Sequence, residues 1–156
     1  MIKENWSRQN LIHILYSTMK IHNCKVYDNY SLFVTHGITL TKSKLFIDLT
    51  YFNFSEELLA RLDSLKLDKL DTGIFNLQLS SELTLGRGTA IRQVTAAKYS
   101  VLSSRTQSSV VLNNVIIYEN YSGTSDGYTM YFYYSKDIEI RNSFFMDNPQ
   151  INIAVI

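Results

Sequence analysis

Two acidic residues, Glu119 and Asp147, are the most plausible candidates for catalysis in this sequence of 156 residues. Each precedes an asparagine, and Arg141 lies between them in the chain. Carboxyl groups about 5 Å apart can serve as the nucleophile and the acid–base of a retaining glycosidase. An acid followed by asparagine is also typical of a turn, and Asp28 repeats the pattern ahead of Asn29. We expect the turn and predict no catalytic residue, with the acidic pair and Arg141 as the alternative.

Few other residues could carry chemistry. His22 and Asp48 form a second possible acid–base pair, although an isolated histidine is more often a plain surface residue. The three histidines and the single cysteine, Cys24, are too far apart to build a four-ligand zinc site. Gly86 and Gly88 lack the lysine and the following helix of a phosphate-binding loop. We therefore predict neither a metal nor a cofactor.

Apolar and aromatic side chains in the C-terminal part are the candidates for binding. Residues 128–134, YTMYFYY, alternate in a way that sends one set of side chains outward from a strand. With residues from two neighbouring segments they predict an outward stripe, which consists of Ile116, Tyr118, Tyr131, Tyr133, Phe144 and Met146. A stripe of this size suits protein association or sugar stacking. The alternative is that a loop or the segment 55–65 covers it.

Four Asn-x-Ser sequons favour an extracellular or cell-surface location, and each is a candidate glycosylation site. They begin at Asn5, Asn29, Asn53 and Asn120.

Composition excludes several classes of protein. The chain is 46% hydrophobic and carries 15 basic and 14 acidic side chains, which argues against a disordered polyelectrolyte and against a nucleic-acid binder. No apolar run is long enough for a membrane span. One cysteine cannot form an internal disulfide. The length favours a single domain, 1–156.

An internal repeat shows what would position these residues. Segments 19–29, 110–120 and 138–148 share a pattern: apolar, any, aliphatic, any, Asn, small or β-branched, any, apolar, bulky, acidic, Asn. Segments 45–55 and 83–93 keep the apolar positions and lose the asparagines. The period is about 27 residues once an insertion near 55–65, predicted as a short helix, is removed. This unit fits one turn of a coil better than a hairpin or a crossover.

Each turn should contain about three strands. Apolar residues two apart predict one inward-facing strand before the first asparagine of the pattern and another after it. The first asparagine therefore lies at a bend, as Asn23, Asn114 and Asn142 would. We predict that Asn114 and Asn142 stack in a buried asparagine ladder.

The repeat resembles that of right-handed parallel β-helices, the pectin-lyase-like proteins, over residues 11–153. The resemblance implies an all-β right-handed parallel β-helix of about five rungs. It says little about chemistry, because this repeat occurs in polysaccharide lyases, glycosidases, tailspikes and adhesins. The catalytic signatures Asn-Thr-Asp, Asp-Asp and Arg-x-Pro-x-x-Arg are missing here. The apolar C-terminal segment predicts that the chain is part of a longer solenoid, with a short solenoid capped by partners as the alternative.

These observations predict a non-catalytic structural or adhesive β-helix module of a larger surface or assembly protein. Its expected partners are other protein chains, flanking rungs of the same polypeptide, or glycans, bound through the outward aromatic stripe. The alternative function is a polysaccharide-degrading glycosidase or lyase that uses Glu119, Asp147 and Arg141.

Overall fold

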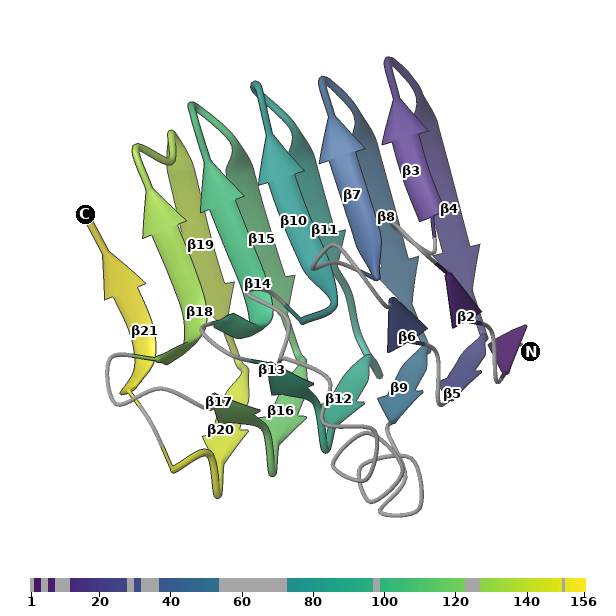
Figure 1. The fold of residues 1–156 in the computed structure, drawn as a ribbon, viewed down its shortest axis with the longest axis vertical. Helices are drawn as coiled ribbons and strands as arrows, with labels where there is room; N and C mark the ends of the chain where they lie inside the picture. The colour runs from purple at the N-terminus through teal and green to yellow at the C-terminus, as the bar shows by residue number, and fades with distance from the viewer. Residues whose placement is uncertain are drawn as a thin grey trace.

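The fold of the protein is given by a computed structural model. It describes residues 2–3, 6–7, 12–27, 30–31, 37–53, 73–96, 99–122, 127–149 and 151–156. Within these ranges the chain is an all-β parallel solenoid with a period of about 27 residues, and it contains no helix. The strands stack side by side from the N-terminal to the C-terminal end (Figure 1).

Three parallel sheets run along the coil, and we number them in the order in which one turn of chain visits them. The first sheet contains β3 (Ile12–Leu15), β7 (Ile38–Thr41), β10 (Phe75–Gln78), β14 (Tyr99–Arg105), β18 (Tyr128–Tyr133) and β21 (Ile151–Val155). The second contains β4 (Thr18–His22), β8 (Lys44–Asp48), β11 (Glu82–Leu85), β15 (Ser109–Asn113) and β19 (Asp137–Arg141). The third contains β1 (Ile2–Lys3), β5 (Lys25–Tyr27), β9 (Tyr51–Asn53), β12 (Ala90–Arg92), β16 (Ile116–Tyr118) and β20 (Phe144–Met146).

Two short parallel pairs accompany these sheets. They are β2 (Trp6–Ser7) with β6 (Tyr30–Ser31), and β13 (Thr95–Ala96) with β17 (Tyr121–Ser122).

The strand register confirms the repeat read from the sequence. The first template positions pair across the second sheet in one continuous column, which runs Met19, Leu45, Leu83, Val110, Ile138. The coil makes about four turns, against the five rungs predicted. The predicted helix at 55–65 lies outside the described residues.

The core fills the coil with aliphatic and aromatic columns. Interior strands bury these side chains almost completely, as at Leu45, Leu83 and Val110. Phe52 and Phe75 meet edge to face, with ring centroids 5.5 Å apart. Full burial of one such side chain stabilises a fold by about 1.5–3 kcal/mol, so the stacked columns supply the main driving force.

The corners between strands use the left-handed backbone conformation. At the second corner, between the second and third sheets, it recurs in one column at Asn23, Leu49, Gly88, Asn114 and Asn142. This confirms the predicted bend. Gly88 has φ +76°, which glycine adopts without strain, and a Cβ there would come within 2.8 Å of the Leu49 side chain and displace it.

The predicted buried ladder of Asn114 and Asn142 is wrong, although the two residues do stack in register. Both are exposed, because the side chain of the left-handed corner residue points away from the interior. The next residue points inward instead, as Val115 does with no exposed surface. An asparagine ladder is present at the third corner, after the third sheet, where Asn148 Oδ1 accepts a hydrogen bond of 3.1 Å from Asn120 Nδ2.

A serine ladder occupies the first corner, between the first and second sheets. Ser17, Ser43, Ser81 and Ser108 follow one another along the coil, and each backbone N–H of the first three donates to the hydroxyl of the next. These hydroxyls in turn donate to carbonyl oxygens, as Ser108 does to Arg105 at 2.8 Å. The ladders pair polar groups that burial would otherwise penalise.

Candidate binding groove

The six residues of the predicted stripe lie on two faces of the coil. Ile116, Tyr118, Phe144 and Met146 belong to β16 and β20 of the third sheet, whereas Tyr131 and Tyr133 belong to β18 of the first. The two sheets face different directions, so these six residues cannot form a single stripe. Phe144 is 60% exposed and Tyr133 is 39% exposed, and both faces therefore present apolar surface.

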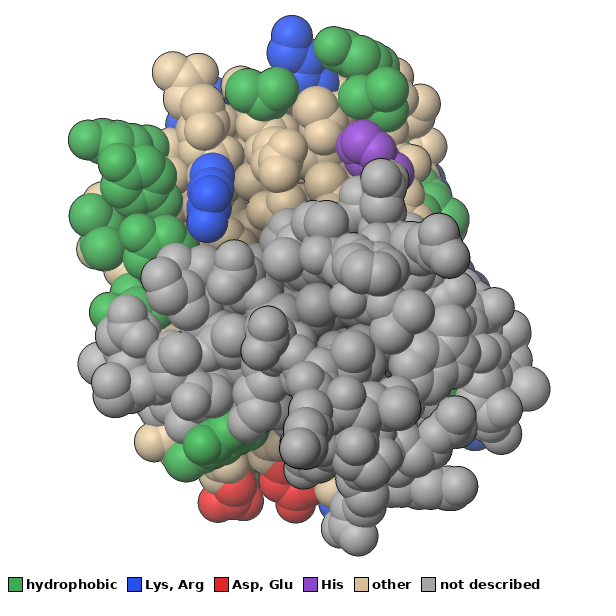
Figure 2. Space-filling view, viewed as in Figure 1, with side chains coloured by type: hydrophobic (Ala, Val, Ile, Leu, Met, Phe, Trp, Pro, Cys, Tyr) green, Lys and Arg blue, Asp and Glu red, His purple; other side chains and the backbone are tan. Residues whose placement is uncertain are grey.

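Tyrosine rings form a continuous row along β18 and into the corner that follows it. The rings of Tyr128 and Tyr131 stack with centroids 5.8 Å apart, and those of Tyr131 and Tyr133 stack at 6.3 Å. Tyr134 then meets Tyr133 edge to face at 4.5 Å. We call these four residues the tyrosine row. Hydrophobic side chains gather at the left of Figure 2, on the side where β18 and β21 lie in Figure 1.

The Tyr133 phenol stays protonated at neutral pH. The neighbouring Tyr134 phenol raises the pKa of Tyr133, and partial burial adds to the effect. A protonated phenol both donates and accepts hydrogen bonds, so the outer rings offer polar contacts as well as flat surface.

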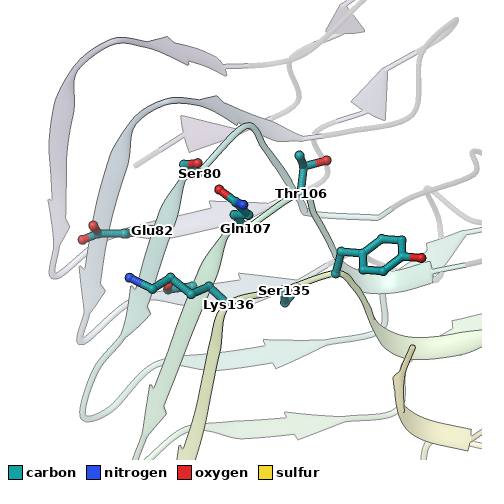
Figure 3. Close-up of a pocket in the computed structure, with 8 residues that line it drawn as sticks. Ser80, Glu82, Thr106, Gln107, Ser135 and Lys136 are labelled. Carbon is teal, nitrogen blue, oxygen red and sulfur yellow. The ribbon is translucent and has the colours of Figure 1, made fainter.

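A groove with a volume of about 790 Å³ lies at the end of the tyrosine row, on the first corner. We call it the corner groove. Its lining residues come from three successive corners and from the strand residues that follow them: Ser80, Glu82, Thr106, Gln107, Ser109, Tyr134, Ser135 and Lys136. Figure 3 shows these side chains projecting from adjacent corners, with Lys136 and Glu82 extending to the same side.

The corner groove arises from a change in corner length. Two residues join the first and second sheets at Tyr16–Ser17 and at residues 42–43. Three residues do so at 79–81, 106–108 and 134–136. Strand register is the same before and after the longer corners, with Gln78 paired to Thr41 and Glu82 to Lys44, so each extra residue bulges outward. The groove therefore forms where the longer corners stack.

The two charged residues that line the corner groove, Glu82 and Lys136, each lie near a residue of opposite charge. Glu82 forms an ion pair of 2.8 Å with Lys44, and Lys136 lies 3.9 Å from Asp137. The serine ladder ends here, because Lys136 occupies the position that Ser108 holds in the preceding turn. Ser135 instead contacts Ser104, with the two hydroxyl oxygens 2.9 Å apart. The groove thus combines hydroxyls, one amide and both signs of charge beside an exposed ring.

The acidic pair of the alternative function has other contacts. Glu119 and Asp147 occupy the third corner on successive turns, both with left-handed backbone. Glu119 Oε2 accepts a hydrogen bond of 2.6 Å from Arg92 Nε, and this contact raises the pKa of Arg92. The guanidinium also lies 5.5 Å from the ring centroid of Tyr118. Arg141 pairs with Glu139 of its own strand, so it does not join the two acids.

The predicted neighbours His22 and Asp48 meet across the second sheet. His22 Nδ1 lies 2.6 Å from Asp48 Oδ1, and both side chains are more than half exposed. They line a shallow hollow of about 550 Å³ with Lys20, Phe46 and Thr84. An exposed polar contact of this kind holds two neighbouring strands together weakly.

Among the described residues, no group of three or more His, Cys, Asp or Glu side chains lies close enough to hold a metal ion. In the same part of the chain, no helix is long and apolar enough to cross a membrane.

The sequons fall in different environments. Asn120 is fully buried, and its Nδ2 donates to the carbonyl oxygens of Ile91 and Tyr118, so this nitrogen has a structural role in the fold. Asn53 is half-buried at the end of β9. Asn5 and Asn29 lie outside the described residues.

Comparison with known proteins found no matching family, no matching curated protein and no matching solved structure.

Proposed function

We propose that this solenoid is a non-catalytic binding module of a surface or assembly protein, and that it holds a carbohydrate chain along the tyrosine row and in the corner groove. The observation that carries the proposal is the continuity between the two. Four rings in contact lead directly into a groove lined by hydroxyl, amide and charged groups.

This combination matches the chemistry of a sugar. The C–H face of a pyranose packs on an aromatic ring, while its hydroxyls need both donors and acceptors at the edge. Tyr134 is 69% exposed and offers the ring. The side chains of Thr106, Gln107 and Ser135 offer the hydrogen-bonding groups beside it.

Two sequence features support the same proposal. The repeat resembles that of right-handed pectin-lyase-like solenoids, many of which act on or bind polysaccharides. The sequons at Asn5, Asn29 and Asn53 are compatible with an extracellular location, where glycans are abundant.

A polysaccharide-degrading enzyme receives less support. Glu119 is engaged by Arg92, and Arg141 is engaged by Glu139. A catalytic pair needs both carboxyl groups free to face one substrate.

The test is binding of the chain to a panel of oligosaccharides and polysaccharides, followed by calorimetry with the best ligand. Tyr134→Ala should weaken binding about tenfold, the value expected for losing one well-placed ring contact. Tyr16→Ala is the matched control. Tyr16 is 68% exposed and occupies the same left-handed corner position at the other end of the coil, away from the groove.

The expected result is a loss of affinity in Tyr134→Ala with no change in Tyr16→Ala. Equal losses in the two variants, or the absence of binding to every glycan in the panel, would overturn the proposal.

A further inference from the structure

We propose that the hollow on the outer face of the second sheet is a second sugar subsite, continuous with the corner groove, so that the module takes an extended polysaccharide chain and not a single terminal sugar. We call it the sheet hollow. It has a volume of about 550 Å³ and lies over β4, β8 and β11. The inference rests on the proposed carbohydrate binding and deepens it, because it names the class of carbohydrate.

The corner groove and the sheet hollow meet on one strand. Glu82 and Thr84 are alternate residues of β11 and are both half-buried, whereas the residues between and after them are buried, so the two side chains project from the same outer face. Glu82 lines the groove and Thr84 lines the hollow. Two residues of an extended strand span about 7 Å. One ligand can therefore pass from the groove to the hollow along the surface of the coil.

Phe46 supplies an aromatic ring to the sheet hollow. It is 37% exposed and points outward from β8, between the buried residues Leu45 and Ile47. Its register neighbours on the two adjacent strands are Lys20 and Thr84, whose side chains end in polar groups. An outward ring that polar side chains flank is suited to packing against the C–H face of a pyranose.

Polar groups surround this ring. His22 Nδ1 and Asp48 Oδ1 lie 2.6 Å apart, and this contact leaves His22 Nε2 and Asp48 Oδ2 without a partner in the described part of the chain. Lys20 forms no ion pair with another described residue. The hollow thus offers an imidazole nitrogen, a carboxylate oxygen, an ammonium group and the Thr84 hydroxyl. Sugar hydroxyls both donate and accept hydrogen bonds, so they can use all four groups.

Gly86 keeps the sheet hollow open. It directly follows β11, and the strand register places it beside Asp48. A Cβ at Gly86 would lie 3.3 Å from both the Asp48 Cβ and the Ile47 carbonyl oxygen. A side chain at this position would therefore crowd Asp48 and take up part of the hollow, whereas glycine leaves that space accessible.

The separation of the two exposed rings favours a long ligand. Tyr134 directly precedes the corner that leads to β19, and Phe46 belongs to β8, three strands away in the second sheet. Three strand spacings amount to about 14 Å, so no single sugar reaches both rings. A chain of several sugars does, and its second contact is then intramolecular, which raises the affinity. The site therefore selects the interior of an extended polysaccharide.

The experiment measures the binding of oligosaccharides of two lengths to the full chain by calorimetry. The probes are the disaccharides and hexasaccharides of cellulose, chitin and alginate, which are a neutral, an acetylated and an acidic polymer. The hexasaccharide of at least one series should bind about tenfold more tightly than its disaccharide. Phe46→Ala should lower the affinity for that hexasaccharide about tenfold and leave the affinity for the disaccharide unchanged, because only the longer chain reaches the hollow.

Two further variants test whether the ring itself is responsible. Phe144→Ala is the matched control, because Phe144 is an exposed phenylalanine of the third sheet that lines neither the groove nor the hollow. It should leave both affinities unchanged. Phe46→Tyr keeps an aromatic ring and should bind the hexasaccharide as tightly as the unaltered chain, which separates loss of the ring from a change in the fold.

Failure of this inference differs from failure of the proposed function. Equal affinities for the two lengths, or equal hexasaccharide affinities in Phe46→Ala and Phe144→Ala, would overturn the second subsite while Tyr134→Ala still weakened binding. Absence of binding to every probe, or unchanged binding in Tyr134→Ala, would overturn the proposed function and this inference with it.

Discussion

Two pairs of asparagines, each 28 positions apart, behave in opposite ways in this solenoid. Asn120 and Asn148 form a ladder at the third corner, where Asn120 has no exposed surface. Asn114 and Asn142 stack equally well at the second corner, yet both are exposed. The residue type and the spacing are the same, so neither determines which pair is buried.

The position relative to the left-handed residue makes the difference. Asn114 is itself the left-handed residue of its corner and points outward. Asn120 follows the left-handed Glu119 and points inward. Ser43 and Ser81 obey the same rule after Lys42 and Ser80.

The largest expected effect is at Asn120. Asn120→Leu removes the acceptor of the Val94 N–H and the donor to the carbonyl oxygens of Ile91 and Tyr118. We expect the free energy of unfolding to fall by about 2–3 kcal/mol, because these groups then have no partner in the interior. Urea denaturation measures the change. A loss below about 0.5 kcal/mol would show that the ladder contributes little.

Ser81→Ala should have a smaller effect. Its hydroxyl accepts a hydrogen bond from the Ser43 N–H and donates to the Gln78 carbonyl at 2.6 Å. The substitution should cost about 1–2 kcal/mol, since one buried donor loses its acceptor while alanine fits the space. Ser109→Ala is the control, because Ser109 is a half-buried strand residue outside the serine ladder. Thermal denaturation of the two variants shows how much of the loss is specific to the ladder.

Asn114→Leu repeats the Asn120 substitution at the exposed pair. The expected loss is at most about 1 kcal/mol, arising from leucine in the left-handed conformation. Leu49 already occupies the same column with φ 48°, so the backbone accepts this residue. If Asn114→Leu destabilised the chain in urea as much as Asn120→Leu, the inward–outward rule would be wrong.

The smallest expected effect is the contribution of Tyr118, which lies next to the third corner, to the stability of the fold at high pH. Burial, followed by the hydrogen bond with Tyr51, raises the pKa of Tyr118 above its ordinary value of 10.0. The folded state therefore holds this proton more tightly than the unfolded state. The resulting stabilisation is complete below about pH 10 and is lost as the pH rises through the folded-state pKa. The melting temperature of the chain should fall more steeply above pH 10 than that of Tyr118→Phe, and parallel curves would contradict this.

The repeat predicted the parallel coil, the core columns and the left-handed corners. Aliphatic residues two apart are inward residues of a strand whatever lies between the strands, so Leu45 and Leu83 could be placed in one column from the sequence. Which asparagines are buried could not be predicted from the sequence. The template contains two asparagines, and only the corner conformation decides which one turns inward.

The corner groove also escaped prediction, although the sequence contains its signal. The last inward residue of the first sheet and the first of the second are five positions apart in Ile14 and Met19, but six apart in Leu77 and Leu83. Treating every turn as one length concealed this difference. The separation of the aromatic residues onto two faces was missed for a related reason, since the alternation within a strand does not reveal its sheet.

The longer corners have a consequence for how such a protein can diversify. At residues 79–80 and 106–107 two consecutive left-handed residues take up the added length, and the strands on either side keep their partners. A residue inserted at a corner therefore leaves the packing of the core unchanged. A new recognition surface can be introduced one residue at a time while the strands keep their positions. Substitution of an inward residue within a strand has no such freedom, because its side chain packs against those of the neighbouring turns.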